Sequence, residues 1–474
     1  MISRRIRISL KLIAFLAILS PLSCGLFPTI RFAFLTPANL DDFDVSDFPR
    51  GFFWGAASSA HQVEGNDIHS DWWPWEEAGK TKSGDKSGLA TNHYNLFEED
   101  MDRLVALNLD TYRFSLNWAR LFPNGPDTPD DAAVARYDEF FVALKARNIR
   151  PMVTLLHFTS PQWVTEADRW GSGHAIEDFR KFAAFCATRW GKDVDWWVTV
   201  NEPDVYAFHG WLRGIFPPGK LEPELSFRVF TNFMKAHAEA YHTIKQVDTI
   251  DADGDGKSSQ IGIAQLIVPV QAFSAFNPAE QSLAYIVAHF INSFWLRSNQ
   301  TGVFDPGVPG FFGPFESYPR LKNTLDFIGI NYYSRQIVRI DLGGIFWGTP
   351  PEAPFVSQLG IEIYPPGLTD SLLTVVPFGL PIMITENGIA DATDKDRAQY
   401  IVSHLAVLAE FMRIRPDVPI LGYIHWSLTD NYEWENGFAP RFGLYAVDYA
   451  TQTRIKRPSA DVFAELISRV KNRP

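Results

Sequence analysis

The stretch Trp196-Trp197-Val198-Thr199-Val200-Asn201-Glu202-Pro203 begins with a short apolar and β-branched run and then turns polar. A near-continuous apolar run of this length is typical of a strand that is buried on both faces, as in a parallel sheet. The stretch therefore predicts a buried parallel strand, Trp196–Val200, that is followed by an amide and a carboxylate.

Seven further runs of this kind recur along the chain. They are Phe52–Ser58, Thr111–Leu116, Met152–Leu156, Ile261–Val268, Phe327–Ile330, Ile382–Thr385 and Ile420–Ile424. Amphipathic segments lie between most of them, namely Tyr94–Leu107, Ala132–Arg147, Ile176–Arg189, Phe227–Val247 and Lys395–Ile414. Eight such units predict an α/β fold, a single (β/α)8 TIM barrel with extended βα-loops over residues 48–470. A doubly wound open sheet is the alternative, but Phe52–Ser59 lacks the Gly-rich phosphate turn of such folds.

Charge and cysteine content exclude several classes of protein. The 55 acidic residues outnumber the 43 Lys and Arg residues, which gives a formal net charge of −12. Since phosphate binding needs a basic face, no nucleic-acid partner is expected. Cys24 and Cys186 are too few for a disulfide framework or a four-ligand metal site. Aromatic residues make up 14% of the chain, which suits either a large aromatic core or a sugar-binding site.

Residues 1–40 have the layout of a targeting segment. Three arginines among the first seven residues precede the apolar stretch Leu12–Leu19, as in a secretory signal. The stretch is short for a membrane span and Pro21 follows it closely. A second apolar patch, Phe32–Leu35, also allows an uncleaved membrane anchor, and Leu22-Ser23-Cys24 is similar to a lipoprotein cleavage box. We expect an exported protein, whether secreted, periplasmic or membrane-tethered; a cytosolic protein with an apolar N-terminal helix is the alternative.

Functional side chains follow seven of the eight predicted strands. They are Gln62, Arg113, His157, Asn201 with Glu202, Asn331 with Tyr333, Glu386, and Trp426. In a TIM barrel all the carboxyl ends of the strands face one mouth, where active sites lie. One polar strand end means little, but seven together predict an active site at this mouth.

Two glutamates stand out among these side chains. Glu202 and Glu386 follow the fourth and seventh strands, on opposite sides of the predicted mouth. Two facing carboxylates are the minimum equipment for glycoside cleavage, in which one protonates the leaving oxygen and the other attacks the anomeric carbon or activates water. The spacing of Glu202 and Glu386 alone is equally consistent with a purely structural role for both residues.

Seven sequence motifs bear on whether the two glutamates are catalytic or structural. They are Phe52-Phe53-Trp54-Gly55-Ala56-Ala57-Ser58-Ser59-Ala60-His61-Gln62-Val63-Glu64-Gly65, Tyr112-Arg113-Phe114-Ser115-Leu116-Asn117-Trp118, Val153-Thr154-Leu155-Leu156-His157, Asn201-Glu202-Pro203, Thr385-Glu386-Asn387-Gly388, Trp426-Ser427-Leu428-Thr429-Asp430-Asn431-Tyr432-Glu433-Trp434 and Arg441-Phe442-Gly443-Leu444. Together they resemble glycoside hydrolase family 1, the β-glucosidase family, from about Phe48 to about Val470.

The resemblance implies a retaining β-glycosidase that releases terminal non-reducing β-D-glucosyl residues from O-glycosides by double displacement. Glu386 matches the nucleophile and Glu202 the acid/base, with their carboxyl groups about 5–5.5 Å apart. Arg113 is placed to keep Glu386 ionised, and Tyr333 matches the tyrosine that donates to the nucleophile. No cofactor and no metal are expected.

Further positions match the sugar-binding residues of the family. Asn201 corresponds to the residue that holds the 2-hydroxyl, and Glu433 to the residue that grips the 4- and 6-hydroxyls. Trp426 resembles the aromatic floor under the sugar ring, and Phe442 an adjacent wall. Three residues match positions that bind the 3- and 4-hydroxyls: Gln62, His157 and Trp434.

Comparison within the family narrows the substrate. A charged Glu433 would repel a phosphate, which argues against 6-phosphorylated sugars, and the presence of Glu202 indicates O-glycosides rather than thioglycosides. Phe158 stands where the family usually has tryptophan, which leaves glucose selectivity open. A β-galactosidase, β-fucosidase or transglycosidase is the alternative enzyme, and a non-hydrolytic sugar-binding barrel is the alternative outside catalysis.

Two apolar segments are predicted to flank the mouth, Val308–Phe315 and Ile345–Val356. They form either a small satellite core or an exposed patch that binds a hydrophobic aglycone, close to a membrane if the N-terminus tethers the chain there. A third segment, Asp251–Gly256, resembles the start of a calcium loop. Position twelve of such a loop would be Gly262 instead of glutamate, so we expect a polar loop and no metal.

Overall fold

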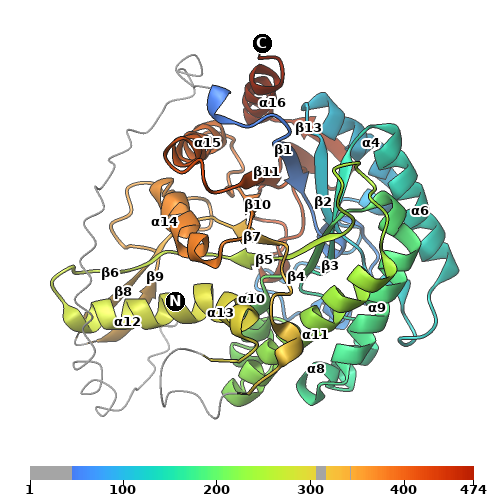
Figure 1. Cartoon of the computed structure of the whole chain (residues 1–474), viewed down its shortest axis with the longest axis horizontal. Coiled ribbons are helices and arrows are strands. Elements are labelled where there is room, and N and C mark those ends of the chain that lie inside the picture. Colours follow the sequence, from blue (N-terminus) through green and yellow to red (C-terminus); the bar gives the residue numbers. More distant parts are fainter. Residues whose placement is uncertain (1–44, 306–315, 342, 474) are drawn as a thin grey trace.

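Eight parallel strands close into a barrel in this computed structural model of the chain (Figure 1). The structure describes residues 45–305, 316–341 and 343–473. The barrel strands are β1 (Phe53–Ala57), β2 (Thr111–Ser115), β3 (Arg150–Leu156), β4 (Trp196–Asn201), β5 (Gln260–Leu266), β7 (Phe327–Asn331), β10 (Ile382–Asn387) and β11 (Ile420–Trp426). Each strand pairs with the next in this order, and β11 pairs with β1 to close the barrel. All eight predicted runs are barrel strands, so the predicted fold class is confirmed.

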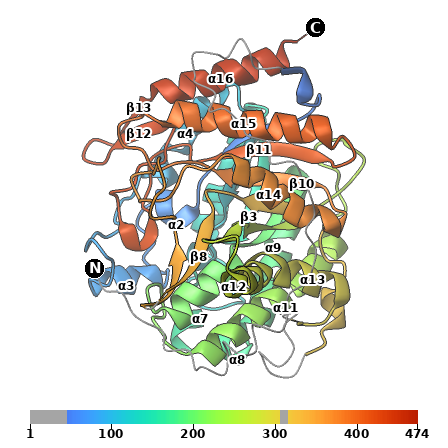
Figure 2. The ribbon, with the colours of Figure 1, turned by 90° about the vertical axis from the view of Figure 1, so that its left-hand side faces the viewer.

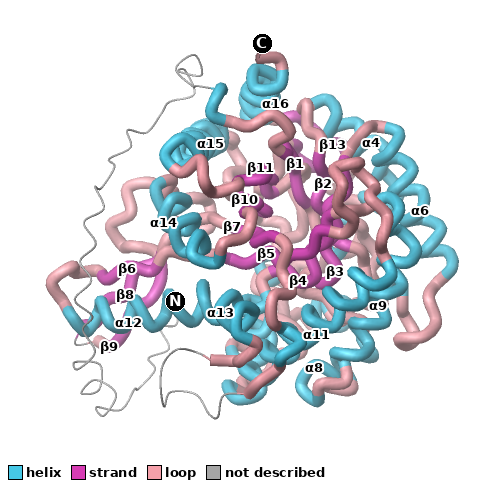
Figure 3. The backbone as a smooth tube through the Cα atoms, viewed as in Figure 1, coloured by secondary structure: helices cyan, strands magenta, loops and turns pink. Residues whose placement is uncertain are grey.

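Helices surround the strands on the outside (Figure 3). The longer ones are α4 (His93–Ala106), α6 (Asp131–Ala146), α9 (Ala175–Trp190), α11 (Pro223–Val247), α12 (Pro278–Ala288), α13 (Phe294–Thr301), α14 (Pro366–Val375), α15 (Arg397–Ile414) and α16 (Pro458–Lys471). The five predicted amphipathic segments are α4, α6, α9, α11 and α15. Their ends differ from the predicted ones by up to four residues.

The sequence of α6 shows why these helices form and pack. Asp130 caps the helix, because its side chain accepts a hydrogen bond from the backbone N–H of Ala133 at 2.8 Å. Tyr137, Phe141 and Leu144 recur every three or four residues and are all buried. One apolar stripe therefore faces the barrel while the rest of the helix faces water.

Two hydrophobic cores result from this architecture. The larger lies between the strands and the helices. The smaller includes inward-facing residues of the barrel strands, among them Met152, Ala264, Met383 and Ile424, and it also includes Trp426 and Phe442. A barrel interior filled in this way is a packed support for side chains at the mouth and leaves no open channel.

Short elements decorate the two ends of the barrel. The short α-helices are α2 (Ala60–Val63), α3 (Trp72–Glu77), α5 (Trp118–Leu121), α7 (Gln162–Glu166), α8 (Arg169–Ser172) and α10 (Pro203–Ala207). Other helical turns are η2 (Val45–Asp47), η3 (Gly191–Asp193), η4 (Phe208–Leu212), η5 (His289–Ser293), η6 (Pro319–Leu321), η7 (Val376–Phe378) and η8 (Trp434–Asn436). A hairpin joins β12 (Tyr445–Asp448) to β13 (Thr453–Lys456).

A second sheet lies beside the barrel. It consists of β6 (Val270–Ala272), β8 (Gln336–Asp341) and β9 (Gly344–Gly348), with α12 packed on β6 and β8. The segment from Ile345, predicted as a loop, is thus partly a strand. Four of its apolar residues are exposed instead of forming a satellite core: Ile345, Trp347, Phe355 and Val356. The apolar loop Val308–Phe315 lies outside the described residues.

The predicted targeting segment, residues 1–40, also lies outside the described residues. Within the part that the structure describes, no helix is both long enough and apolar enough to span a bilayer.

Candidate active site

Arg113 lies at the centre of the predicted site. The sequence predicted Arg113 at the end of its strand, but it is the third of the five residues of β2 (Thr111–Ser115). Its guanidinium nevertheless reaches the mouth. Nη1 donates to Glu386 Oε1 at 2.5 Å, and Nη2 donates to Asn201 Oδ1 at 2.6 Å. Nε donates to Thr154 Oγ1 at 3.2 Å, and the whole side chain is buried. The planar guanidinium therefore fixes the positions of Glu386 and Asn201 at once.

Glu386 is held on both of its carboxylate oxygens. Besides the Arg113 contact, Oε2 accepts a hydrogen bond from the Tyr333 hydroxyl at 2.6 Å. Both partners donate, an arrangement that suits an ionised, acceptor-only carboxylate. Gly388 is the first residue after β10. A Cβ at this position would lie 1.8 Å from the carbonyl oxygen of Trp426. The glycine thus lets the ends of β10 and β11 approach each other, which brings Glu386 near Trp426.

Glu202 occupies a different environment. It follows β4 in the left-handed region, with φ 40°, and its Oε1 accepts a hydrogen bond from Asn331 Nδ2 at 2.8 Å. Burial, reinforced by the negative charge of Glu386, raises the pKa of Glu202 well above its usual value. Burial and the charge of Glu386 therefore both favour the protonated form of Glu202.

Asn331 connects the two carboxyl groups. Its Nδ2 also donates to Asn201 Oδ1 at 3.1 Å, so hydrogen bonds run from Glu202 through Asn331, Asn201 and Arg113 to Glu386. Sequence reasoning placed Asn331 at the end of the sixth strand but gave it no role. The available signal was its position two residues before Tyr333.

His157 is a neutral imidazole that accepts a hydrogen bond from Asn201 on one ring nitrogen and carries its own hydrogen on the other. Asn201 Oδ1 already accepts two hydrogen bonds, so Asn201 Nδ2 donates to His157 Nε2 at 3.2 Å. Burial, aided by the charge of Arg113, lowers the pKa of His157 well below its usual value. The proton of the neutral ring is therefore on Nδ1, a buried atom with no hydrogen-bond partner among the described residues. Such an unpaired buried donor suits a ligand hydroxyl.

Aromatic rings form the wall around His157. Its ring stacks between Trp426, at 5.8 Å and 23°, and Trp434, at 6.0 Å and 21°. Phe442 meets Tyr333 edge-on at 6.1 Å. Four predicted aromatic or histidine positions thus lie together beside the two glutamates.

Glu433 lies next to Trp426, whose Nε1 donates to Glu433 Oε1 at 3.3 Å. Burial, which outweighs that hydrogen bond and is helped by the charge of Glu386, raises the pKa of Glu433 to about 8. At neutral pH this carboxyl is therefore largely protonated. The expected repulsion of a phosphate is correspondingly weaker than the sequence suggested.

Gln62 is fully buried, and its amide is largely occupied. Nε2 donates to Asn431 Oδ1 at 3.0 Å and to the Tyr432 carbonyl at 2.8 Å, while Oε1 accepts from Ser59 Oγ at 2.6 Å. A sugar hydroxyl can still donate to the free lone pair of Oε1. The predicted contact of Gln62 is thus limited to that of an acceptor.

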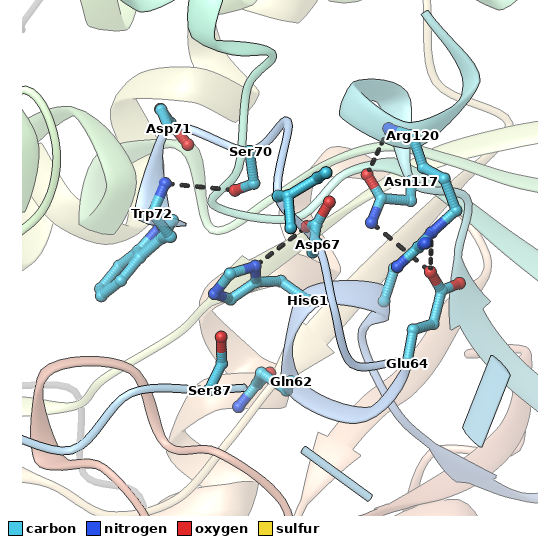
Figure 4. Close-up of polar contacts among 12 residues, drawn as sticks. His61, Gln62, Glu64, Asp67, Ser70, Asp71, Trp72, Ser87, Asn117 and Arg120 are labelled. Carbon is cyan, nitrogen blue, oxygen red and sulfur yellow. Dashed lines mark hydrogen bonds and ion pairs between the residues drawn. The ribbon is translucent and has the colours of Figure 1, made fainter. Parts of the chain in front are cut away.

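A buried cluster of charged side chains surrounds His61, next to Gln62 in the chain, and was not predicted from the sequence; Figure 4 shows His61, Asp67 and Ser87. His61 Nδ1 is 2.9 Å from Asp67 Oδ2, and His61 Nε2 is 2.8 Å from Glu76 Oε1. Glu76 Oε2 accepts hydrogen bonds from both the backbone N–H and the hydroxyl of Ser87. The ring of His61 lies parallel to Trp434, at 5.8 Å and 8°. The cluster therefore joins α2, α3 and the loop residues Asp67 and Ser87, and the His61 ring connects it to Trp434.

The protonation of His61 leads to a prediction about stability. Burial lowers the pKa of His61, but the negative charges of Glu76 and Asp67 and their hydrogen bonds outweigh it and raise the pKa to about 10. This stabilisation is complete below the unfolded-state pKa of about 6.5 and is lost as the pH rises through about 10. At pH 6, His61→Gln should lower the free energy of unfolding by roughly 3–5 kcal/mol, because it leaves two buried carboxylates unpaired.

Unfolding by urea between pH 6 and pH 10 measures this effect. Wild type should lose stability toward pH 10 more steeply than His61→Gln. The matched control is His404→Gln, since burial lowers the pKa of His404 to about 3 and this residue stays neutral throughout. If His61→Gln and wild type have parallel pH profiles, His61 is not charged in the folded protein.

The chain is similar to known glycosidases over most of its length. Residues 45–472 match the family model described as glycosyl hydrolase family 1. A β-galactosidase of Pyrococcus woesei is 31% identical over 89% of this chain and 97% of its own length. β-Glucosidase A of Thermotoga maritima is 30% identical over 90% of this chain and 98% of its own.

Solved structures agree with these sequence relatives. A β-glycosidase from Pyrococcus horikoshii superposes with a TM-score of 0.79 at 32% identity, covering 89% of this chain and 94% of the other. A β-glucosidase from Thermotoga maritima in complex with glucoimidazole gives a TM-score of 0.81 at 28% identity, covering 89% and 99%. The match extends across the whole barrel and includes all the strands that carry the site.

Proposed function

Because the chain belongs to glycosyl hydrolase family 1 and is a glycosidase, we propose that it hydrolyses terminal non-reducing β-D-glucosyl residues of O-glycosides with retention of configuration. The observation that supports this proposal most is the contrast between its two linked glutamates. Glu386 accepts hydrogen bonds from Arg113 and Tyr333, whereas Glu202 is kept protonated by burial and by the charge of Glu386. Opposite protonation states are what an acid and a nucleophile require.

The first chemical step follows from these states. Glu386 attacks the anomeric carbon while Glu202 transfers its proton to the departing glycosidic oxygen. The bond to the aglycone breaks, the aglycone leaves as an alcohol, and a glycosyl ester forms on Glu386. Asn201, fixed by Arg113, has its Oδ1 occupied by Arg113 and Asn331, so it donates from the remaining hydrogen of Nδ2 to the 2-hydroxyl of the sugar during this step.

The second step reverses the role of Glu202. Once Glu386 is esterified, its negative charge is gone, and with it one of the causes that raise the pKa of Glu202; burial and the charge of Asp204 remain. Glu202 is then ionised and takes a proton from the water that attacks the anomeric carbon. The sugar leaves with its original configuration, and Glu386 is again a carboxylate.

Product stereochemistry and an aryl-glycoside panel test this proposal. Proton NMR during hydrolysis should show the β-anomer of the free sugar first, and the α-anomer only after mutarotation. Release of nitrophenol from the β-glucoside should exceed release from the β-galactoside and β-fucoside. The opposite order would favour the β-galactosidase or β-fucosidase alternative, which the name of the Pyrococcus woesei relative also suggests. Transfer of the glycosyl group to an added alcohol in place of water would indicate a transglycosidase, and no turnover at all would indicate a sugar-binding barrel.

Glu433 should read the 4- and 6-hydroxyls of the sugar. Glu433→Ser removes both contacts, and hydrogen bonds from a largely protonated carboxyl contribute about 0.5–1.5 kcal/mol each, so it should reduce kcat/KM on β-glucosides by the equivalent of roughly 1–3 kcal/mol in transition-state binding. The loss should be smaller on β-fucosides, which lack the 6-hydroxyl. Glu433→Gln is the matched variant, because it keeps a neutral donor and acceptor and should lose less. Equal losses on the two sugars would show that Glu433 does not contact the 6-hydroxyl.

We further propose that the aglycone is hydrophobic. The segment that follows the sixth barrel strand leaves four apolar side chains exposed: Ile345, Trp347, Phe355 and Val356. Transfer of alkyl carbon from water to such a surface contributes about 0.8 kcal/mol per CH₂. For alkyl β-glucosides of increasing length, kcat/KM should therefore rise in wild type and rise less in Trp347→Ser. A flat series in wild type would contradict a hydrophobic aglycone site.

The pattern of residues 1–40 supports export, with the chain either released or tethered through its N-terminus. Cell fractionation combined with N-terminal sequencing of the mature protein tests this. Recovery from the cytosolic fraction with an intact N-terminus would exclude export.

A further inference from the structure

The exposed aromatic residues of the described chain are concentrated in one unit. Among the large hydrophobic side chains that the described residues leave exposed, five are aromatic: Phe273 (47% exposed), Phe276 (95%), Tyr285 (65%), Trp347 (51%) and Phe355 (54%). All five belong to residues 270–288 and 336–359, which form β6, α12, β8, β9 and the loop after β9. We call this unit the aromatic protrusion. Exposed aromatic groups of this number indicate a contact surface.

Charged side chains are depleted in the same unit. Residues 270–288 and 336–359 contain only four charged residues, Glu280, Arg339, Asp341 and Glu352, whereas about nine would be expected from the chain's charged fraction of 21%. Glu280 is buried, and its carboxylate accepts hydrogen bonds from the backbone N–H groups of Ile340, at 2.9 Å, and Ser274, at 2.8 Å. Of the other three, Asp341 and Glu352 are exposed and Arg339 is half-buried.

The protrusion is an ordered support for these rings. Val338 of β8 is fully buried, and β8 pairs with both β6 and β9. The guanidinium of Arg339 lies between the rings of Phe273, at 5.5 Å, and Phe346, at 5.6 Å. Tyr285 belongs to α12 and Trp347 to β9, while Phe273 and Phe276 lie in the short connection between β6 and α12 and Phe355 in the loop after β9. The sheet and the helix thus support the segments that carry the exposed rings.

The protrusion lies at the mouth end of the barrel. β6 begins four residues after the carboxyl end of β5, and β8 begins five residues after the carboxyl end of β7, both of which face the mouth. Figure 1 shows the unit at the left edge of the molecule, and Figure 2, in which that side faces the viewer, shows α12 and β8 near the centre of the view and away from α16. A surface that binds the protrusion would therefore lie close to the candidate active site.

We propose that the aromatic protrusion docks the barrel mouth on a lipid surface, with its rings at the level of the headgroups. Trp, Tyr and Phe side chains favour this interfacial region. The net charge of −12 opposes attraction to anionic lipids, so the partner is a neutral or zwitterionic bilayer. The docking deepens the proposed function, because it presents the site to glycosides carried by lipids, but its test does not depend on sugar specificity.

The length of the N-terminal chain is compatible with this orientation. The apolar stretch that could tether the protein ends at Leu19, and 25 residues separate it from Val45, the first described residue. An extended chain of that length reaches about 85 Å. The diameter of a compact domain of this size is about 60 Å. A tether at Leu12–Leu19 would therefore allow the protrusion to reach the same membrane.

An environment-sensitive fluorophore at the tip of the protrusion tests the docking. The full chain carries Phe276→Cys in a Cys24→Ser background, and Cys186 is fully buried and does not compete for the label. On addition of phosphatidylcholine vesicles we expect a blue shift and an emission increase of about two-fold or more. Trp347→Cys supplies a second label site on β9 and should respond in the same way.

The matched control is Val142→Cys, at a position 68% exposed on α6 outside the protrusion, which should show no change. No response at the two protrusion sites, or an equal response at Val142→Cys, would overturn the proposal. A shift that appears without vesicles as protein concentration rises would identify a second copy of the chain as the partner and would also overturn it. Unchanged melting temperatures show that the labelled variants are folded, whether or not any glycoside is turned over.

Discussion

Glu386→Ala should lower turnover of every β-glycoside by on the order of 10⁵-fold, because it removes the group proposed to form the covalent intermediate. Removal of the Glu386 carboxylate leaves space for a small anion between Arg113 and Tyr333, which both contact that carboxylate. Arg113 supplies a positive charge at this place. Added azide should therefore attack the anomeric carbon directly. The product should be the glycosyl azide of inverted configuration, identified by NMR.

The isosteric variant Glu386→Gln provides the control for folding. It should be equally inactive toward water while keeping the melting temperature of wild type within a few degrees, since the amide fills the same volume. An azide product of retained configuration from Glu386→Ala would assign the nucleophile to a different residue.

Glu202→Ala should give a different pattern, which depends on the leaving group. Loss of general acid catalysis should cost about 10²–10⁴-fold on alkyl glycosides, whose leaving oxygen needs a proton. Dinitrophenyl glycosides need no such proton, so their glycosylation step should be nearly unaffected. Azide should then accelerate breakdown of the intermediate and give a product of retained configuration.

Asn331→Ala is the informative companion variant, because Asn331 donates to Glu202 at 2.8 Å. It should shift the pH dependence of kcat/KM without abolishing turnover. Equal losses on alkyl and dinitrophenyl substrates in Glu202→Ala would contradict the role of Glu202 as proton donor.

The barrel could be predicted from sequence because its determinants are local. Each buried strand is an apolar run such as Phe327–Ile330, and each covering helix repeats apolar residues every three or four positions. Strand boundaries were less certain. Arg113 was predicted to end its strand but lies in the middle of β2. The prediction failed because a polar side chain can reach the mouth of a narrow barrel from the middle of a strand.

The site was predictable only in part, since hydrogen-bond networks join residues far apart in sequence. The positions of Glu202 and Glu386 after buried strands were visible in the sequence. The link through Asn331, and the pairing of His61 with Glu76, depend on side chains that only the folded chain brings together. The raised pKa of Glu433 was also invisible, because burial cannot be read from a motif.

The exposure of the apolar segment around Trp347 could likewise not be decided from sequence. Apolar residues in a loop are consistent with a satellite core as well as with a surface patch. The strand β9 lies at the edge of its sheet, so its side chains have neighbours on one side only.

The central claim is that Glu386 becomes covalently attached to the sugar. A 2-deoxy-2-fluoro-β-glucoside with a dinitrophenyl leaving group tests it most directly. The fluorine withdraws electron density from the anomeric carbon and slows both steps, while the good leaving group restores only the first, so the intermediate should accumulate. Mass spectrometry should then show one fluoroglucosyl group per chain, attached in the digest to the peptide that carries Glu386. A label on any other residue, or no label on an enzyme that turns over ordinary β-glucosides, would contradict the account.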